Sequence, residues 1–414
     1  MKTDRSVALA FGGLAAMAAA IGIGRFVYTP ILPVMLTALG WSKSDAGVIA
    51  SANFVGYLIG ALLASLAFAA ARPRWWLLAA LLLSSVTTAA MALSSNIIFF
   101  VALRFVGGAA SAFVIVCAST LVLEQLAISG RHSLSGIHFA GVGVGIMVSA
   151  LAVSTMLLWD ASWKDLWIGS GMLAALASIV AALLIPQRRE TAAKPQATDP
   201  QTQLPGIGAM ILAYGLFGFG YVITATFLIA IVRLTENIHV LEPWVWIIFG
   251  LAAIPSVSVW GWLGRRIGIF NAFAVACALE ALGVAASVEW VTIPGIAVGT
   301  LLLGGTFMGI TALGFVAGRM LAAGNSQQAL GRMTASFSVG QMAGPVVAGF
   351  LSERLGDFRV ASLIAAAALV AAAALAARTS WAVAAHTNRQ KAAAAANPTS
   401  PQMAPDTAVR TGRH

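Results

Sequence analysis

Twelve long apolar stretches are the feature of this sequence that most restricts its fold. The hydrocarbon core of a bilayer is about 30 Å thick, so a helix needs about 20 apolar residues to cross it. Only 9% of the 414 residues are charged and 60% are hydrophobic, whereas about a quarter of a soluble domain is charged. This composition excludes a soluble enzyme, a secreted disulfide scaffold and a disordered protein. We therefore predict an all-α polytopic membrane protein with twelve transmembrane helices, near residues 8–37, 44–69, 75–94, 97–126, 135–158, 165–186, 207–234, 244–263, 270–288, 294–321, 333–352 and 359–379.

The charged residues predict how the chain lies across the membrane. Basic residues gather in the loops on one side, and the loops on the other side hold most of the acids. Besides both termini, the basic side holds Arg72, Arg74, Arg131, Arg188, Arg189, Arg265, Arg266 and Arg332. Basic loops mark the cytoplasmic side, so we expect both termini in the cytoplasm. This topology explains the net charge of +10 without a nucleic-acid partner. We expect the protein to be a monomer in the lipid bilayer.

A polar segment with three prolines, residues 187–206, divides the predicted helices into two sets of six. It predicts an N-terminal six-helix bundle over residues 1–186, a cytoplasmic linker over 187–206 and a C-terminal six-helix bundle over 207–380. Residues 381–414 are rich in Ala, Pro and Thr, and we predict a disordered cytoplasmic tail there.

Glycines recur in the same order in the two halves. Glycines at four-residue spacing let helices approach closely in lipid, so any one pair is typical of ordinary packing. Three pairs in matching order predict a parallel repeat of six helices, the layout of a large class of secondary transporters. The pairs are Gly22 and Gly24 with Gly218 and Gly220, Gly107 and Gly108 with Gly304 and Gly305, and Gly141 and Gly145 with Gly340 and Gly344.

Several of these segments resemble motifs of the major facilitator superfamily. The stretch 261–268 (GWLGRRIG) resembles the superfamily's G-x-L-a-D-R-x-G loop, with Arg266 at its arginine. Arg265 stands where that motif has its acid, so the sequence departs from the family at its gating ion pair. Arg104 with the glycines that follow it resembles the R-x-x-Q-G motif without its glutamine. The resemblance implies two pseudo-symmetric six-helix bundles with a substrate site between them.

Further motifs narrow the resemblance. Gly340, Gly344 and Pro345 resemble the antiporter-type glycine-proline motif, although they lie in the predicted eleventh span, and the fifth span keeps only Gly141 and Gly145. Residues 22–33 (GIGRFVYTPILP) and 214–227 (YGLFGFGYVITATF) resemble the signature of the YbfB/YjiJ-type transporters. The resemblance implies a bacterial inner-membrane transporter of a family whose substrates are mostly unassigned.

Arg25 is the strongest candidate for a functional residue. It lies about two-thirds of the way along the first span, and a charge at membrane depth costs at least ~2.5–3.5 kcal/mol on insertion scales. One hypothesis is an anchor for an anionic substrate, because guanidinium binds carboxylate through a planar fork. The other is a structural arginine bonded to helix carbonyls or to the other half. Pro30 and Pro33 should kink this helix, either as a gating hinge or as a simple bend.

The remaining candidates are polar groups on helices that should approach the cavity. Arg104 is expected to support Arg25 or proton transfer, or to snorkel outward. His138 is a candidate proton carrier or substrate ligand, although packing is the favoured interpretation. Tyr28, Tyr221, Thr224 and Gln341 are each typical of an interhelical hydrogen bond, and together with Arg25 they form the predicted site. The acid Glu280 lies in the ninth span, and a structural pairing is expected for it.

These features favour a secondary active transporter of a small solute that works by alternating access. Two arginines in the membrane point to an organic anion, and proton coupling is left open. The alternative is a multidrug or metabolite efflux exporter, and a sensor without transport is a third hypothesis. A membrane enzyme is not expected, because we find no catalytic cluster. The sequence also has no P-loop and no Cys/His/Asp cluster with metal-ligand spacing, so no cofactor is expected.

Overall fold

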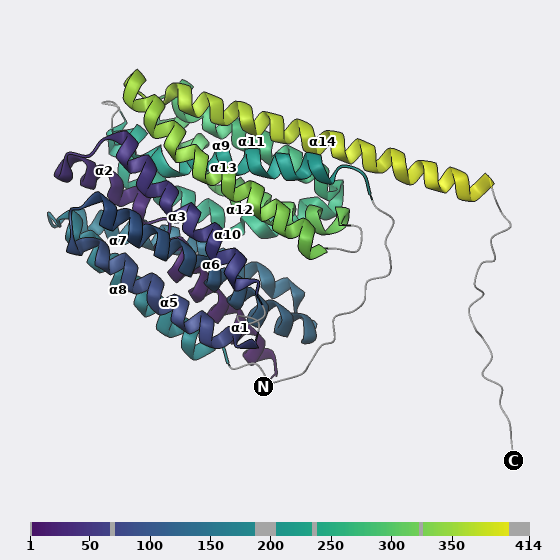
Figure 1. Ribbon diagram of the computed structural model, residues 1–414, viewed down its shortest axis with the longest axis horizontal. Coiled ribbons are helices and arrows are strands. Elements are labelled where there is room, and N and C mark those ends of the chain that lie inside the picture. Colours follow the sequence, from purple (N-terminus) through teal and green to yellow (C-terminus); the bar gives the residue numbers. More distant parts are fainter. Residues whose placement is uncertain (1, 67–70, 187–203, 234–237, 323–325, 397–414) are drawn as a thin grey trace, which may run out of the picture.

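The protein, described by a computed structural model at residues 2–66, 71–186, 204–233, 238–322 and 326–396, consists of helices joined by short turns and loops over that part of the chain (Figure 1). The N-terminal half contains α1 (Lys2–Met17), the π-helix η1 (Ala18–Ile23), α2 (Tyr28–Leu39), α3 (Lys43–Ala64), α5 (Pro73–Ala90), η2 (Met91–Leu93), α6 (Ile97–Ile128), η3 (His132–Leu134), α7 (Ser135–Leu157) and α8 (Trp163–Leu184). The C-terminal half contains α9 (Ile207–Arg233), η4 (His239–Leu241), α10 (Glu242–Ile267), α11 (Ile269–Glu289), α12 (Ile293–Leu321), α13 (Ser326–Leu355) and α14 (Arg359–Ala396).

The predicted all-α fold of twelve membrane segments is confirmed. In the described part of the chain, eleven segments are long and apolar enough to cross a membrane, the first of them formed by α1, η1 and α2 together. The twelfth, α13, carries more polar side chains, among them Ser336, Ser338 and Gln341. This helix packs against α3 and α9, which explains how it tolerates a polar face that lipid would not.

The two halves have the same internal arrangement. In the N-terminal half α1 packs on α7, α3 on α6, and α5 on α8. The same pairs recur in the C-terminal half as α9 on α13, α10 on α12, and α11 on α14. The bundles meet mainly where α3 packs on α13 and α7 packs on α10. Figure 1 shows the first half, in purple and blue, beside the second, in teal to yellow, with α3 next to α13.

The repeated glycines explain why the two halves pack alike. A Cβ on Gly141 would collide with the carbonyl of Leu14, so glycine at this position allows α7 to pack closely on α1. A Cβ on Gly340 would collide in the same way with the carbonyl of Gly215, so glycine there allows α13 to pack closely on α9. The motif glycines Gly145 and Gly344 lie one turn further along the same two contacts. Small residues therefore set the same backbone approach in both bundles.

The first membrane segment is broken earlier than its prolines predict. Helix α1 passes into the π-helix η1, and irregular backbone follows at residues 24–27 before α2 begins. Pro30 lies in the first turn of α2 and Pro33 inside it. Short π-helical segments are frequent at functional sites. The break therefore falls at Arg25 and not at the prolines.

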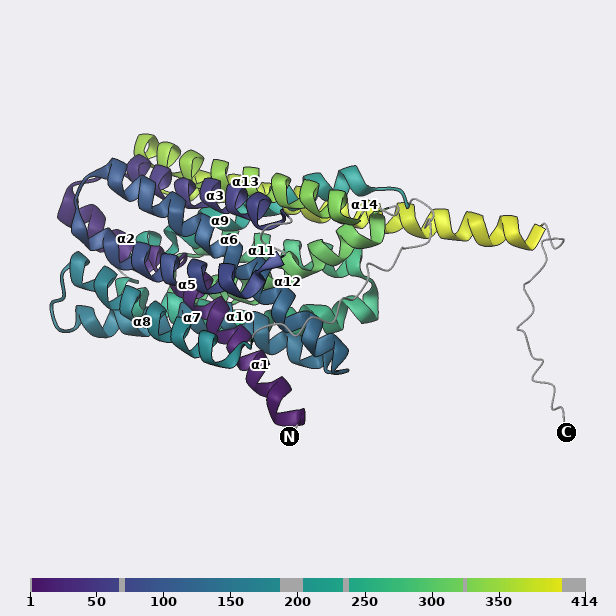
Figure 2. The ribbon, with the colours of Figure 1, turned by 60° about the horizontal axis from the view of Figure 1, so that its bottom comes forward.

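The last helix corrects the predicted C-terminal boundary. Residues 381–396, predicted as part of a disordered tail, continue α14 as a helix of 38 residues in all. Alanine, the best helix former, dominates this stretch and explains the extension. At 1.5 Å per residue the helix is about 57 Å long, and its end projects beyond the bundles (Figure 2). The rest of the predicted tail, residues 397–414, and linker residues 187–203 lie outside the described residues.

Two neighbouring glycines of α12 provide a test of this packing. A Cβ on Gly304 would collide with the carbonyl of Phe249 on α10, whereas a Cβ on Gly305 would meet nothing within 4 Å. We expect Gly304→Ala to lower the free energy of unfolding by about 1–3 kcal/mol, because backbone must move. Gly305→Ala should leave it unchanged or raise it, since Ala favours helix over Gly. Thermal unfolding in detergent measures both, and equal losses would contradict the assigned packing.

Candidate substrate site between the two bundles

Arg104 holds the broken backbone of the first membrane segment. From α6, its Nη1 donates to the carbonyl of Gly24 at 3.1 Å and its Nη2 to the carbonyl of Arg25 at 3.0 Å. Its guanidinium also lies 4.9 Å from the ring centroid of Tyr28. Breaking a helix in the membrane frees carbonyls that need partners. Arg104 is thus buried against backbone and does not snorkel outward.

Tyr28 belongs to the same arrangement and faces away from the other bundle. Its hydroxyl donates to the carbonyl of Ala46 on α3 at 2.9 Å. Its ring is tilted against Trp167 of α8, with centroids 6.5 Å apart. Tyr28 and Arg104 therefore fix the start of α2 within the N-terminal bundle.

Arg25 is the side chain that the broken helix presents. It is 6% exposed, and its guanidinium carbon lies 4.5 Å from the ring centroid of Phe54 and 4.6 Å from that of Tyr57. Both rings come from α3, and such cation–π contacts stabilise a buried cation. Its Nε and Nη2 atoms have no hydrogen-bond partner, and none of the carboxylates in the described segments forms an ion pair with it. Among the described residues, this buried cation thus has no carboxylate that neutralises it.

Polar groups of the C-terminal bundle lie opposite Arg25. Gln341 of α13 donates from its Nε2 to the hydroxyl of Tyr221 on α9, and Arg25 lies close enough to that hydroxyl to interact with it electrostatically. The Oε1 of Gln341 and the Oγ1 of Thr224 are buried without a partner. Nearby, Thr29 of α2 donates to the carbonyl of Ala225 at 2.9 Å, which joins the bundles. The structure therefore brings Arg25, Tyr221, Thr224 and Gln341 to one interface.

His138 lies elsewhere. Its Nε2 is 3.2 Å from the Oγ of Ser119 on α6, and its ring occupies the space that Gly13 leaves on α1. Gly13 precedes Arg25 by twelve residues, about 18 Å along a helix. This geometry favours the packing interpretation of His138.

The predicted gating residues occupy three different places. Gly141, Gly145, Gly340 and Gly344 lie inside the bundles, as described above. The carbonyl of Pro345 faces Gly47 of α3 across the bundle interface. Arg265 and Arg266 are exposed in the last turn of α10, where Arg266 lies 5.2 Å from the ring centroid of Trp262. These two arginines are therefore remote from Arg25.

Phe54 and Tyr57 are site residues that the sequence analysis missed. They lie three residues apart on α3, on the face that also carries the buried Ala50. The signal available in the sequence was a pair of aromatic residues at i, i+3 spacing in the span that follows the one with Arg25. Aromatic residues are common in membrane helices, however, and only the fold places these two over Arg25.

Glu280 is the carboxylate buried deepest in the C-terminal bundle. It is 0% exposed on α11, and its Oε2 accepts a hydrogen bond from the Oγ1 of Thr306 on α12 at 3.1 Å. Its Oε1 has no partner. The group it pairs with is therefore a hydroxyl and not a cation.

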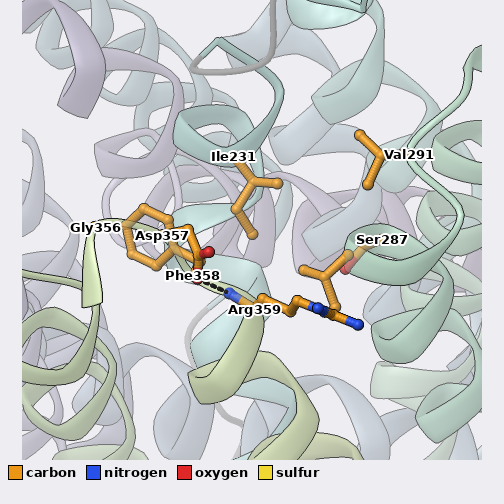
Figure 3. A pocket seen from close by; sticks show the side chains of 8 residues that line it. Ile231, Ser287, Val291, Gly356, Asp357, Phe358 and Arg359 are labelled. Atoms are coloured by element: carbon orange, nitrogen blue, oxygen red, sulfur yellow. Dashed lines mark hydrogen bonds between the residues drawn. The ribbon is translucent and has the colours of Figure 1, made fainter.

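The space around Arg25 is closed. Phe54, Tyr57 and Tyr221 are 4%, 9% and 3% exposed. A cavity of about 350 Å³ lies elsewhere, between the ends of α9 and α11 and the segment that joins α13 to α14 (Figure 3). Its wall includes Arg359, whose side chain forms an exposed ion pair with Glu289. Arg25 is therefore closed off from solvent in this structure.

The contrast between the two buried arginines can be tested by their stability effects. Arg104→Met should lower the free energy of unfolding by about 2–4 kcal/mol, because two hydrogen bonds to a charged group are lost. Arg25→Met should leave stability unchanged or raise it, because the unpaired donors of Arg25 are costly to bury. Thermal unfolding of the purified variants measures both. A loss at Arg25→Met as large as at Arg104→Met would show that Arg25 is structural.

Comparisons with known proteins agree with this fold. Residues 17–377 match the family described as "Uncharacterised MFS-type transporter YbfB". A comparison with curated proteins gives no significant match. Crystal structures of the nucleoside transporter NupG are similar in fold: a point mutant has a TM-score of 0.68 and 15% identity over 90% of this chain and 99% of its own. A second NupG structure has a TM-score of 0.63 and 17% identity over 91% of this chain and 98% of its own. The chain therefore belongs to the YbfB family and is a multi-pass membrane transporter of the major facilitator type.

Proposed function

We propose that the chain is a secondary active transporter that carries a small organic anion by alternating access, with Arg25 as the anion-binding residue. The observation that supports this is a buried guanidinium with two unpartnered nitrogens at the bundle interface. Residues 1–186 and 207–380 are the two bodies that rock about the site. The distribution of basic loops supports a cytoplasmic location of both termini. The resemblance to the YbfB/YjiJ-type transporters supports the bacterial inner membrane as its location.

The charge balance around Arg25 favours an anion. An intramembrane charge is costly and usually faces a partner or a cavity. Arg104 lies close enough to Arg25 for the two cations to repel each other, which raises the positive potential further. A bound carboxylate would accept from the unpartnered nitrogens of Arg25 and compensate its charge. The same positive charge disfavours cationic drugs, so no observation favours the multidrug exporter.

The similarity to NupG shows the fold and does not carry over its substrate. Nucleosides are uncharged, and a site for a neutral ligand has no need of an unneutralised cation. The charge of Arg25 therefore favours an organic anion over a nucleoside for this chain.

The contacts between the bundles suit a rocking motion. The contacts between α3 and α13 lie toward the side where α2 ends and α3 begins. We call this the opposite side, because it lies across the membrane from the proposed cytoplasmic side. Lys43 donates to the carbonyls of Ser352 and Gly356, and Ser51 donates to the carbonyl of Met342. In each case a side chain donates to backbone carbonyls, and water can take its place when this side opens. Bundle separation on this side would expose Arg25, as alternating access requires.

Transport by Arg25 variants tests the anchor. We expect proteoliposomes with the wild-type chain to take up labelled organic acids when anion or proton gradients are imposed. Arg25→Met should lower kcat/KM about 30-fold or more, because truncating one partner of a buried charge pair costs about 2–5 kcal/mol. Arg25→Lys should retain part of the activity, since it keeps the charge without the planar fork.

The matched control is Arg354→Met, which removes an exposed arginine of α13 that lies over Phe350. It should transport as the wild type does. Anion uptake by Arg25→Met at the wild-type rate would exclude Arg25 as the anchor.

Opening of the opposite side can be tested by labelling. A Cβ on Gly47 would collide with the carbonyl of Pro345 in the other bundle. We expect Gly47→Ala, combined with Ser51→Cys, to increase labelling by a membrane-impermeant maleimide several-fold, because the bundles must separate there. Both native cysteines are buried, so the background should be low. Gly60→Ala, which collides with Ala109 inside the N-terminal bundle, should not increase labelling, and an equal increase would argue against separation of the bundles.

A further inference from the structure

Five aromatic rings of the C-terminal bundle lie side by side, with neighbouring ring planes 5° to 34° apart. We call Tyr214, Phe217 and Tyr221 of α9, Phe307 of α12 and Phe337 of α13 the aromatic wall. The ring plane of Tyr221 lies within 5° of that of Phe337, 20° of that of Phe307 and 24° of that of Phe217. The spacing of three and four residues along α9 puts its three rings on one helix face.

The wall reaches the residue next to Arg25. Phe26 meets Phe307 edge to face, with centroids 6.0 Å apart and planes at 80°. The guanidinium carbon of Arg25 lies 5.7 Å from the ring centroid of Phe26. The ring of Phe26 therefore lies near both the guanidinium of Arg25 and a ring of the other bundle.

The edge of the wall near Arg25 is polar, which packing alone does not require. Tyr221 carries its hydroxyl and its partner Gln341 there, and Gln341 Oε1 and Thr224 Oγ1 have no partner. Both residues are 0% exposed. Buried polar atoms are normally satisfied, so these atoms indicate that a ligand completes the site.

We propose that the transported anion is aromatic, with its carboxylate on Arg25 and its ring on Phe307 and Tyr221. This inference rests on the proposed function. A flat ring that enters between Phe26 and Phe307 takes the place of their edge contact and can stack on Phe307 with an offset, one of the two arrangements that aromatic pairs favour. An aliphatic acid fills the same space without this stacking. The guanidinium of Arg25 would lie beside the bound ring of the substrate. This position fits a carboxylate that is attached directly to that ring.

Binding of matched acids to the full-length protein in detergent tests the proposal. The probes are benzoate and 1-naphthoate, each compared with its saturated counterpart, cyclohexanecarboxylate or decahydro-1-naphthoate, by isothermal titration calorimetry at pH 7. Benzamide and succinate provide a neutral ring and an aliphatic dianion. We expect at least one aromatic acid to bind about three- to tenfold more tightly than its saturated counterpart, the range that ring stacking contributes.

Substitutions locate the effect. Phe307→Leu should remove most of the preference for the aromatic acid, and Arg25→Met should abolish binding of both acids. Phe26→Leu is a second wall-facing variant in case Phe307→Leu does not fold. The matched control is Phe273→Leu, which removes a buried ring at the far edge of the wall, 6.4 Å from the Phe217 centroid, and should keep the preference.

The outcomes separate this inference from the proposed function. Equal affinity for aromatic and saturated acids, or Arg25-dependent binding of succinate alone, would overturn the aromatic substrate and leave anion transport standing. Binding of benzamide as tight as that of benzoate would overturn the carboxylate. If no anion binds and none is transported, both proposals fall. A preference kept in Phe307→Leu and Phe26→Leu would place the ring elsewhere and overturn the assignment.

Discussion

The two hydrogen bonds from Arg104 to the carbonyls of Gly24 and Arg25 are the interaction on which the candidate site depends. A helix broken inside a membrane must satisfy its free backbone groups within the protein. The planar fork of arginine can serve two carbonyls at once, which a lysine cannot do in the same way. With the backbone held in this manner, the side chain of Arg25 is free to lie over Phe54 and Tyr57. Arg104 therefore stabilises the break in the helix, and Arg25 occupies the space beside the break.

The fold around this break repeats a single packing rule. Gly141 on Leu14 and Gly340 on Gly215 bring equivalent backbones together in the two bundles. The N-terminal bundle has its break at the level of Arg25, whereas α9 continues unbroken at the corresponding Tyr221. The repeat thus gives both bundles the same helix packing, and the break in only one of them gives the two bundles different side chains at the interface. The first half contributes the charge, and the second contributes the rings and neutral polar groups.

The sequence predicts the fold well because membrane segments and small-residue contacts are local signals. Apolar length marks the spans, and glycine order marks the repeat. The site is harder to predict, because it depends on which residues from distant helices meet. The two interpretations offered for Arg25 illustrate this: hydrogen bonding to helix carbonyls is present in the structure, but Arg104 provides it. Phe54 and Tyr57 have no sequence signal apart from their spacing. The helical residues 381–396 were missed because a run of alanine in a polar tail is typical of disorder as well as of helix.

The closed arrangement suggests how a substrate would couple the two bundles. Arg25 lies on one bundle, and Tyr221, Thr224 and Gln341 lie on the other. A ligand can shift a conformational equilibrium only by binding one state better than the other. Under the proposed function, an anion that touches both groups binds best when they are close together, and so stabilises the closed state. Without an anion, the unpartnered donors of Arg25 make that state less favourable. The unpaired charge would therefore serve both as the binding group and as the reason that closure follows binding.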